Sequence, residues 1–158
     1  LRQPGALDVV AKHPQCGVCL MHMHRDPQTM QVAPMEGDVV QQVGEFLRTQ
    51  AQLLQDRGVG ASRIVLDPGI GFGKTVQQNF TLLLQQGVIQ SIGYPILAGW
   101  SRKSSLGAVT GLPVEERLVP SVAAALLSVD RGARIVRVHD VRETVAALAV
   151  WSAMQSTN

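Results

Sequence analysis

Polar and charged residues follow several apolar segments of this chain at the point where each segment ends. They are Met21 and His22, Asp67, residues 101–103, and Arg137 with His139. In parallel α/β folds, ligands bind at the carboxyl edge of the strands because helix N-termini and short loops converge there. The pattern therefore predicts a small-molecule site built from residues that are far apart in the sequence.

The glycine-rich segment 67–75 follows one predicted strand and opens a predicted helix. Its glycines allow backbone amides to approach an anion, and Gly73-Lys74-Thr75 matches the end of a nucleotide-binding P-loop. That loop also requires glycine at position 68, where this chain has proline. Asp67 is better suited to a ligand with several N–H donors, because a carboxylate accepts two parallel hydrogen bonds. A glycine-rich turn without a ligand is the alternative.

Two further segments carry cations. Residues 101–104 (Ser-Arg-Lys-Ser) precede a predicted helix, where a cation and hydroxyls form an anion or carboxylate pocket; a solvated basic turn is the alternative. Arg137 and His139 alternate with valines, so a strand would place both on one face. We favour a phosphate site over a surface pair, because a barrel interior cannot easily bury two such groups unpaired.

Histidine and cysteine pairs raise the question of a metal. His22 and His24 lack a third ligand or a zinc-binding helix motif. Cys16 and Cys19 form a single C-x-x-C, which can be a redox pair or half a zinc site, but no second pair follows. Since the surrounding segment is typical of a buried strand, we expect both cysteines to pack in the core.

Short apolar segments alternate with amphipathic ones along the whole chain. Strands are expected at 17–23, 63–67, 94–99 and 133–140, and helices at 4–12, 38–58, 75–86, 115–131 and 141–154. Strands separated by helices at this spacing favour a parallel sheet with helical crossovers. Four such units are too few for an eight-stranded barrel of about 250 residues. The architecture is therefore either a small open sheet or the second half of a barrel.

Composition narrows the class of protein. The chain has 158 residues, 46% of them apolar and 16% charged, with a net charge of +2, which suits one globular domain. No block of lysine and arginine stands out, so we expect neither nucleic acid nor a membrane surface as partner. The apolar segments are too short to span a bilayer. We expect no signal peptide before the fold, and the free cysteines fit a reducing, cytoplasmic environment.

Taken together, the segments resemble the dihydropteroate synthase family. The matching stretches, in the family's order, are residues 20–23, 27–31, 66–74, 99–104, 116–118 and 137–141. The resemblance covers nearly the whole chain and implies an α/β fold, the C-terminal half of a TIM (β/α)8 barrel. Residues 1–158 would be a single partial domain holding barrel strands five to eight.

The resemblance implies a folate-pathway transferase. The family joins 4-aminobenzoate to 6-hydroxymethyl-7,8-dihydropterin diphosphate, releases pyrophosphate with help from Mg2+, and is the target of sulfonamides. By similarity, Asp67 would accept hydrogen bonds from the amino-pyrimidine edge of the pterin. Lys103 would donate to the pterin ring near the incoming amine, and Met21 would line the pterin slot.

The same resemblance assigns the other two parts of the site. Phe72 would pack on the aminobenzoate ring, and Ser104 would hold the aminobenzoate carboxylate. Arg137 and His139 would bind the diphosphate, with Arg137 also lying over the pterin face. Lys103, Arg137 and His139 are the residues expected to act in catalysis. The family is usually a homodimer through its later helices, which correspond to residues 115–131 and 141–155 here.

Several family features have no counterpart in this chain. The asparagine that helps to hold Mg2+ lies in the family's first strand loop, so no metal ligand is assigned to any residue here. Other N-terminal loops of the family are also absent, and a non-catalytic half-barrel is therefore an alternative. Another pterin-binding barrel, such as a methyltetrahydrofolate methyltransferase, is a further alternative; residues 101–104 argue against it, since that family has no aminobenzoate to hold.

Overall fold

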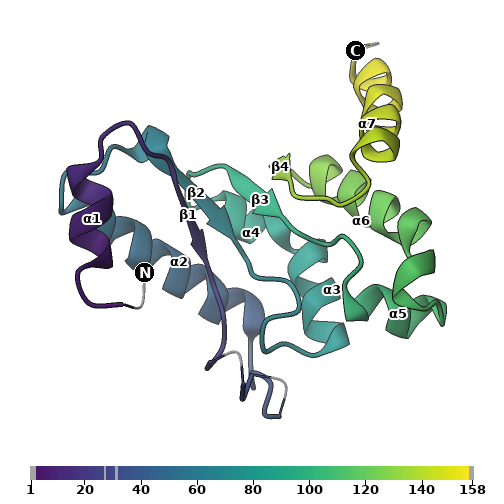
Figure 1. Ribbon diagram of the computed structural model, residues 1–158, viewed down its shortest axis with the longest axis horizontal. Coiled ribbons are helices and arrows are strands. Elements are labelled where there is room, and N and C mark those ends of the chain that lie inside the picture. The colour runs from purple at the N-terminus through teal and green to yellow at the C-terminus, as the bar shows by residue number, and fades with distance from the viewer. Residues whose placement is uncertain (1–2, 27, 31, 157–158) are drawn as a thin grey trace.

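The computed structural model describes residues 3–26, 28–30 and 32–156. In chain order, the elements are α1 (Ala6–Lys12), β1 (Val18–Met21), α2 (Val39–Gln55), a 3-10 turn (Ala61–Arg63), β2 (Ile64–Asp67), α3 (Val76–Leu84), α4 (Gln86–Gln90), β3 (Ile96–Ala98), α5 (Ser104–Thr110), a second 3-10 turn (Val114–Glu116), α6 (Leu118–Asp130), β4 (Ala133–Val136) and α7 (Val141–Gln155). Four strands thus alternate with helices, as the sequence predicts (Figure 1).

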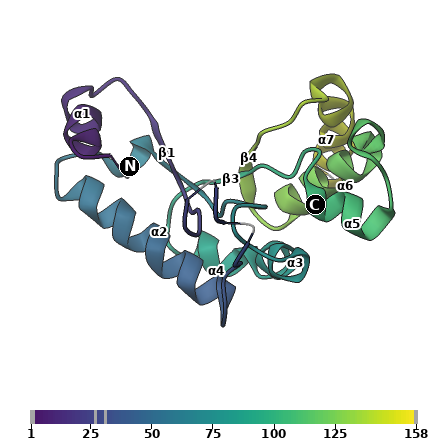
Figure 2. The ribbon, with the colours of Figure 1, turned by 60° about the horizontal axis from the view of Figure 1, so that its bottom comes forward.

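The strands form one parallel sheet in the order β1-β2-β3-β4. Each strand therefore lies beside the next one along the chain, and all carboxyl ends meet at one edge. Met21 and Asp67, the last residues of β1 and β2, are direct neighbours in the register. Helices α2, α3 and α4 lie on the same side of the sheet (Figure 2), which is the arrangement of a barrel wall.

Helix α2 shows how the sequence builds this layer. The Asp38 side chain caps its start, accepting hydrogen bonds from the backbone N–H of Val40 at 2.9 Å and of Gln41 at 3.0 Å. Such a cap contributes about 1 kcal/mol. Buried apolar residues recur at helical spacing: Val39, Val40, Val43, Leu47, Ala51 and Leu54. Each buried valine or leucine contributes roughly 1.5–3 kcal/mol, so α2 is held chiefly by its packing against the sheet.

The expectation that both cysteines pack in the core is wrong. Cys16 and Cys19 are free thiols and are exposed. In β1, Leu20 faces the helices and is buried, so the alternation of side chains places Cys19 on the opposite face. Within the described part of the chain, the helices cover only one face, and a residue on the other face keeps its contact with solvent.

The last strand is shorter than the predicted 133–140, because β4 ends at Val136. Arg137 still donates its backbone N–H to Ala98 O at 3.0 Å, but the N–H of His139 turns to the Ser101 hydroxyl at 3.2 Å. Arg137 and His139 therefore lie in the loop after β4, not on one face of a strand. The predicted helix 75–86 corresponds to α3 (76–84), and the short helix α4 (86–90), which the sequence analysis did not predict, follows it.

No helix in the described part of the chain has the length and apolar character needed to span a bilayer.

Candidate active site

Asp67 is a buried carboxylate at the end of β2, with only 3% of its surface exposed. One oxygen accepts the backbone N–H of Gly69 at 2.7 Å, and the other accepts the Arg137 guanidinium at 3.3 Å. Burial raises the pKa of Asp67, because it disfavours the charged form, while the Gly69 hydrogen bond and the charges of Arg137, Lys103 and Lys74 oppose this rise. The carboxylate depends on its cationic surroundings to remain ionised.

Lys103 provides an ammonium group close to an aromatic ring. Its Nζ lies 4.2 Å from the centroid of the Phe72 ring, within the range of a cation–π interaction. Burial and the neighbouring Arg137 lower the pKa of Lys103, and Asp67 counteracts them. The two residues come from different loops, β2–α3 and β3–α5, which meet at the carboxyl edge of the sheet.

His139 is oriented by a serine. Its Nδ1 lies 2.8 Å from the hydroxyl of Ser101, which also accepts the backbone N–H of His139. Ser101 is buried in the β3–α5 loop, three residues after the end of β3, and this pair of contacts joins that loop to the β4–α7 loop. The hydrogen bond at Nδ1 fixes the plane of the imidazole ring and therefore also the direction in which Nε2 points.

A cavity of about 190 Å³ joins these groups. It is lined by Phe72, Gly99, Ser101, Lys103, Arg137, Val138 and His139. A Cβ at Gly99 would lie 2.6 Å from Nη2 of Arg137, so a larger residue there would displace that guanidinium. The structure thus brings together five residues that the sequence analysis selected, although they come from three separate segments.

Three selected residues are not in the cavity lining: Asp67, which meets the cavity through its ion pair with Arg137, and Met21 and Ser104. Met21 ends β1, is half-buried, and pairs with Asp67 in the sheet. Ser104 is the first residue of α5 and is exposed, directly after Lys103. Their predicted roles in binding remain predictions.

Sequence reasoning missed Lys74 as part of the site's support. This lysine is only 4% exposed, and its Nζ contacts His22 and two backbone carbonyls of the loop after β2. Burial lowers the pKa of Lys74 from 10.5 to about 7, with Asp67 raising it and Lys103 lowering it further. In the sequence Lys74 suggested only a partial P-loop match, since nothing local shows that its side chain folds back beneath the loop.

Arg102 was named from the sequence only as part of the segment 101–104, and its supporting role was not predicted. It has a left-handed backbone with φ of 60°, which is unusual for a residue other than glycine. Its N–H donates to Ser121 Oγ at 2.9 Å, its carbonyl accepts from Arg117 at 3.2 Å, and its guanidinium contacts Asp140 at 2.7 Å. The Arg102 guanidinium holds the pKa of Asp140 below its usual range. These contacts fix the backbone that presents Lys103 to the cavity.

The residues present do not suit a divalent metal. Among the described residues, no group of three or more histidine, cysteine or acidic side chains is placed to hold a metal ion. Asp67 is surrounded by cations, and Nδ1 of His22 faces the ammonium of Lys74 at 2.9 Å. Mg2+ prefers several oxygen ligands in an octahedral arrangement, and this edge of the sheet does not provide them.

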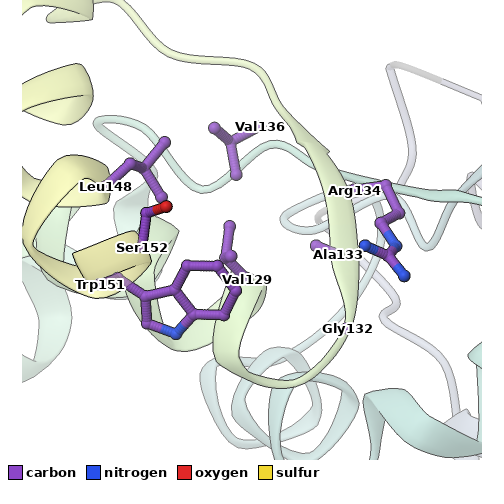
Figure 3. Close-up of a pocket in the computed structure, with 8 residues that line it drawn as sticks. All are labelled: Val129, Gly132, Ala133, Arg134, Val136, Leu148, Trp151 and Ser152. Atoms are coloured by element: carbon purple, nitrogen blue, oxygen red, sulfur yellow. The ribbon is translucent and has the colours of Figure 1, made fainter. Parts of the chain in front are cut away.

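A second hollow, of about 320 Å³, lies between β4 and α7 (Figure 3). Leu148 and Trp151 of α7 face Val129 and Val136 across it, whereas Arg134 lies on the other side of β4. Its largely apolar walls lack the carboxylate and the cluster of cations found at the first cavity. The buried carboxylate and its surrounding cations therefore lie at the carboxyl edge of the sheet and not at this hollow.

A parallel sheet with helices on one side, and with a carboxylate among cations at its carboxyl edge, is the arrangement of a ligand-binding α/β barrel. Residues 2–139 match the family described as pterin binding enzyme, and the chain belongs to that family. Within it, the chain is a homologue of the dihydropteroate synthases, which confirms the resemblance drawn from the sequence.

Three relatives show the extent of the match. The chain is 45% identical over 158 residues to the dihydropteroate synthase of Neisseria meningitidis serogroup B, covering 98% of this chain and 55% of that protein. The Stenotrophomonas maltophilia enzyme structure superposes with a TM-score of 0.96 at 46% identity, covering all of this chain and 60% of that one. The Burkholderia cenocepacia enzyme complexed with 7,8-dihydropteroate gives 0.91 at 54% identity, covering 99% and 58%.

The chain thus spans little more than half the length of these relatives. The matches confirm the predicted α/β fold as a partial pterin-binding barrel.

Proposed function

We propose that this chain forms the C-terminal part of a dihydropteroate synthase active site, which joins 4-aminobenzoate to a dihydropterin diphosphate. One observation carries the proposal: Asp67, Lys103, Arg137 and His139 converge beside Phe72 at the carboxyl edge of the sheet. A flat ligand with N–H donors at one end and a diphosphate at the other matches this arrangement, because the donors would face Asp67 and the diphosphate would face Arg137 and His139.

The pterin would bind at the buried carboxylate. Asp67 accepts hydrogen bonds, and the adjacent amino and ring N–H groups of a pterin offer two parallel donors. Met21, the neighbour of Asp67 in the sheet, would form part of the slot. The cations around Asp67 support its ionised form, which burial disfavours. The Burkholderia cenocepacia relative is complexed with 7,8-dihydropteroate, the product expected here.

The diphosphate would face Arg137 and His139. In the reaction, the lone pair of the aromatic amine forms a C–N bond at the pterin methylene carbon. The C–O bond to the diphosphate breaks, the electron pair leaves with pyrophosphate, and the amine nitrogen loses a proton. Arg137 and His139 would stabilise the charge that grows on the leaving group, and Lys103 would act beside the reacting atoms. The chemistry needs no nucleophile from the protein.

The aminobenzoate would lie against Phe72, with its carboxylate at Ser104. This places its amine near Lys103, whose Nζ lies over the Phe72 ring, and a held amine attacks far more readily than a free one. A Xanthomonas albilineans relative binds 4-aminobenzoic acid, and a Yersinia pestis relative binds a sulfonamide drug. We infer that sulfonamides would compete for the same place. Any Mg2+ ligand would come from outside this chain.

Ligand binding by the 158-residue chain tests the proposal. Titration calorimetry with 6-hydroxymethylpterin diphosphate should show binding that weakens about 10- to 100-fold in Asp67→Asn or Lys103→Met, since each change removes a charge-assisted contact. Lys12→Met is the matched control, because Lys12 is an exposed lysine of α1. Equal affinity in all four proteins would refute the assignment.

The alternative of a non-catalytic half-barrel is tested by turnover. If the purified chain incorporates 4-aminobenzoate into dihydropteroate, it carries enough of the active site to act alone. If it binds the pterin diphosphate but gives no product, the groups that complete catalysis lie outside the chain.

We also propose that α6 and α7 form a homodimer contact. Exposed apolar side chains gather on these two helices, which pack against each other: Val119, Leu127, Val145, Val150 and Met154. Sedimentation velocity should show a dimer that Val145→Asp dissociates. Val9→Asp, in the distant helix α1, should leave it intact, and a monomer at all concentrations would contradict the proposal.

A further inference from the structure

Lys74 lies beneath the proposed site without facing the cavity. Its Nζ lies 2.9 Å from Nδ1 of His22, 2.9 Å from the carbonyl oxygen of Gly69 and 3.2 Å from that of Phe72. An ammonium has three N–H donors, so these three acceptors satisfy it completely. The side chain is 4% exposed and has no direct role in the reaction described above.

We propose that Lys74 is a positioning residue, whose buried side chain ties the loop bearing Phe72 to the end of β1 and so sets the spacing between the pterin and aminobenzoate pockets. The inference rests on the proposed function. It concerns a residue that would touch neither substrate.

The loop itself supports this role. Phe72 donates its N–H to Gly69 O at 3.1 Å, and Gly71 donates to the side chain of Asn79 at 2.9 Å. The segment is therefore a tight turn with Phe72 near its crest, and Lys74 binds a carbonyl on each side of that crest. Removing the ammonium would leave two inward-facing carbonyls without this donor, at the position that fixes Phe72.

The other end of the tie is well anchored. His22 donates its backbone N–H to Asp67 O at 3.0 Å, and its ring packs edge-on against Phe46 with centroids 5.0 Å apart. His22 therefore directly follows β1 and is hydrogen-bonded to the backbone of Asp67, the last residue of β2. Through His22 and Phe72, Lys74 spans the distance between the proposed pterin edge and the proposed aminobenzoate ring.

The charge of Lys74 has a second effect. The Lys74 ammonium favours the ionised form of Asp67. Burial and the positive charge of Lys103 both disfavour the charged form of Lys74 itself. The titratable groups that face Lys74 are thus Asp67 from β2, Lys103 from the β3–α5 loop and His22 after β1. As pH rises through 7, Lys74 loses its proton, and this support for the Asp67 carboxylate disappears.

A lysine that merely stabilised the fold would give a different result from a positioning residue. Hydrogen exchange of the intact chain separates the two, because it reports opening residue by residue. In Lys74→Met, the amides of Gly71 and Phe72 should exchange at least tenfold faster relative to those of α2 and α6, whose rates follow the stability of the whole chain. Lys12→Met, on an exposed lysine, should change neither set.

Ligand binding supplies the functional measurement. With 6-hydroxymethylpterin diphosphate as probe, Lys74→Met should raise the Kd at least tenfold and flatten its pH dependence between pH 6 and 8.5, where wild-type binding weakens. Unchanged loop exchange, or faster exchange throughout the chain, would overturn the positioning role, as would a wild-type Kd in Lys74→Met.

The two proposals can fail separately. If the wild-type chain does not bind the probe, and Asp67→Asn behaves identically, the proposed function fails. The exchange measurement then decides the role of Lys74 by itself: loosening confined to the loop supports the tie, and unchanged protection overturns it.

Discussion

The stability of this protein should rise with pH because of one buried lysine. Burial lowers the pKa of Lys74 from 10.5 to about 7 in the folded chain, whereas the unfolded chain keeps the ordinary value. Between these two values the unfolded state binds more protons than the folded state, so raising the pH favours folding. Below pH 7 the folded chain carries the full free-energy cost of burying a charged Lys74, and above pH 10.5 this cost vanishes.

The size of the effect follows from the difference of about 3.5 between the two pKa values. At about 1.36 kcal/mol per pKa unit, the penalty below pH 7 is about 5 kcal/mol. Over the practical range from pH 7 to 9.5, the free energy of unfolding should rise by about 3 kcal/mol relative to a variant without the amine. Lys74 is almost fully buried, so solvent screening does little to reduce this value.

Urea unfolding of wild type and Lys74→Met at pH 7, 8, 9 and 9.5 measures the effect. Trp100 is a suitable fluorescent probe, because it is 2% exposed and packs against Phe80. Subtracting the two free energies removes contributions from groups that titrate in both proteins. The difference in free energy of unfolding between wild type and Lys12→Met should show no such rise with pH. A flat difference for Lys74→Met as well would show that the lysine keeps an ordinary pKa, and would refute the reasoning.

Three further predictions test the local geometry. Gly69→Ala should destabilise the chain by more than about 3 kcal/mol in urea unfolding, because φ is +71° and the new Cβ would overlap the backbone oxygen of His22. The control Gly58→Ala, where φ is +79° but the space is open, should cost only about 1 kcal/mol. Ser101→Ala removes the hydroxyl that orients the neighbouring imidazole, so pyrophosphate affinity should fall about tenfold by calorimetry; unchanged affinity would count against that imidazole as a ligand. Iodoacetamide at pH 8 should modify Cys16 before Cys19, as followed by peptide mass spectrometry, because burial and the Asp67 charge raise the pKa of Cys19; the reverse order would contradict this.

Local patterns were sufficient for the four strands and for most of the helices, although the short helix α4 was not predicted. The caps at Asp38 and Thr75 and the apolar spacing of α2 are short-range features, and the corresponding helices begin where the sequence predicts. Strand ends were less predictable. The segment after β4 leaves the sheet because the hydroxyl of Ser101, a residue 38 positions earlier, competes for the backbone N–H of His139.

The sequence by itself determined which residues could do chemistry, since residue types and their positions after apolar strands mark the carboxyl edge of a parallel sheet. It selected Asp67, Lys103 and Arg137, and the structure brings them together. Only the tertiary structure decided what supports them. Cys19 is exposed because helices from elsewhere in the chain cover the opposite face of its strand, and Lys74 is buried because its side chain folds back beneath its own loop onto His22. Burial is a property of neighbours in space, and no local pattern of residues fixes it.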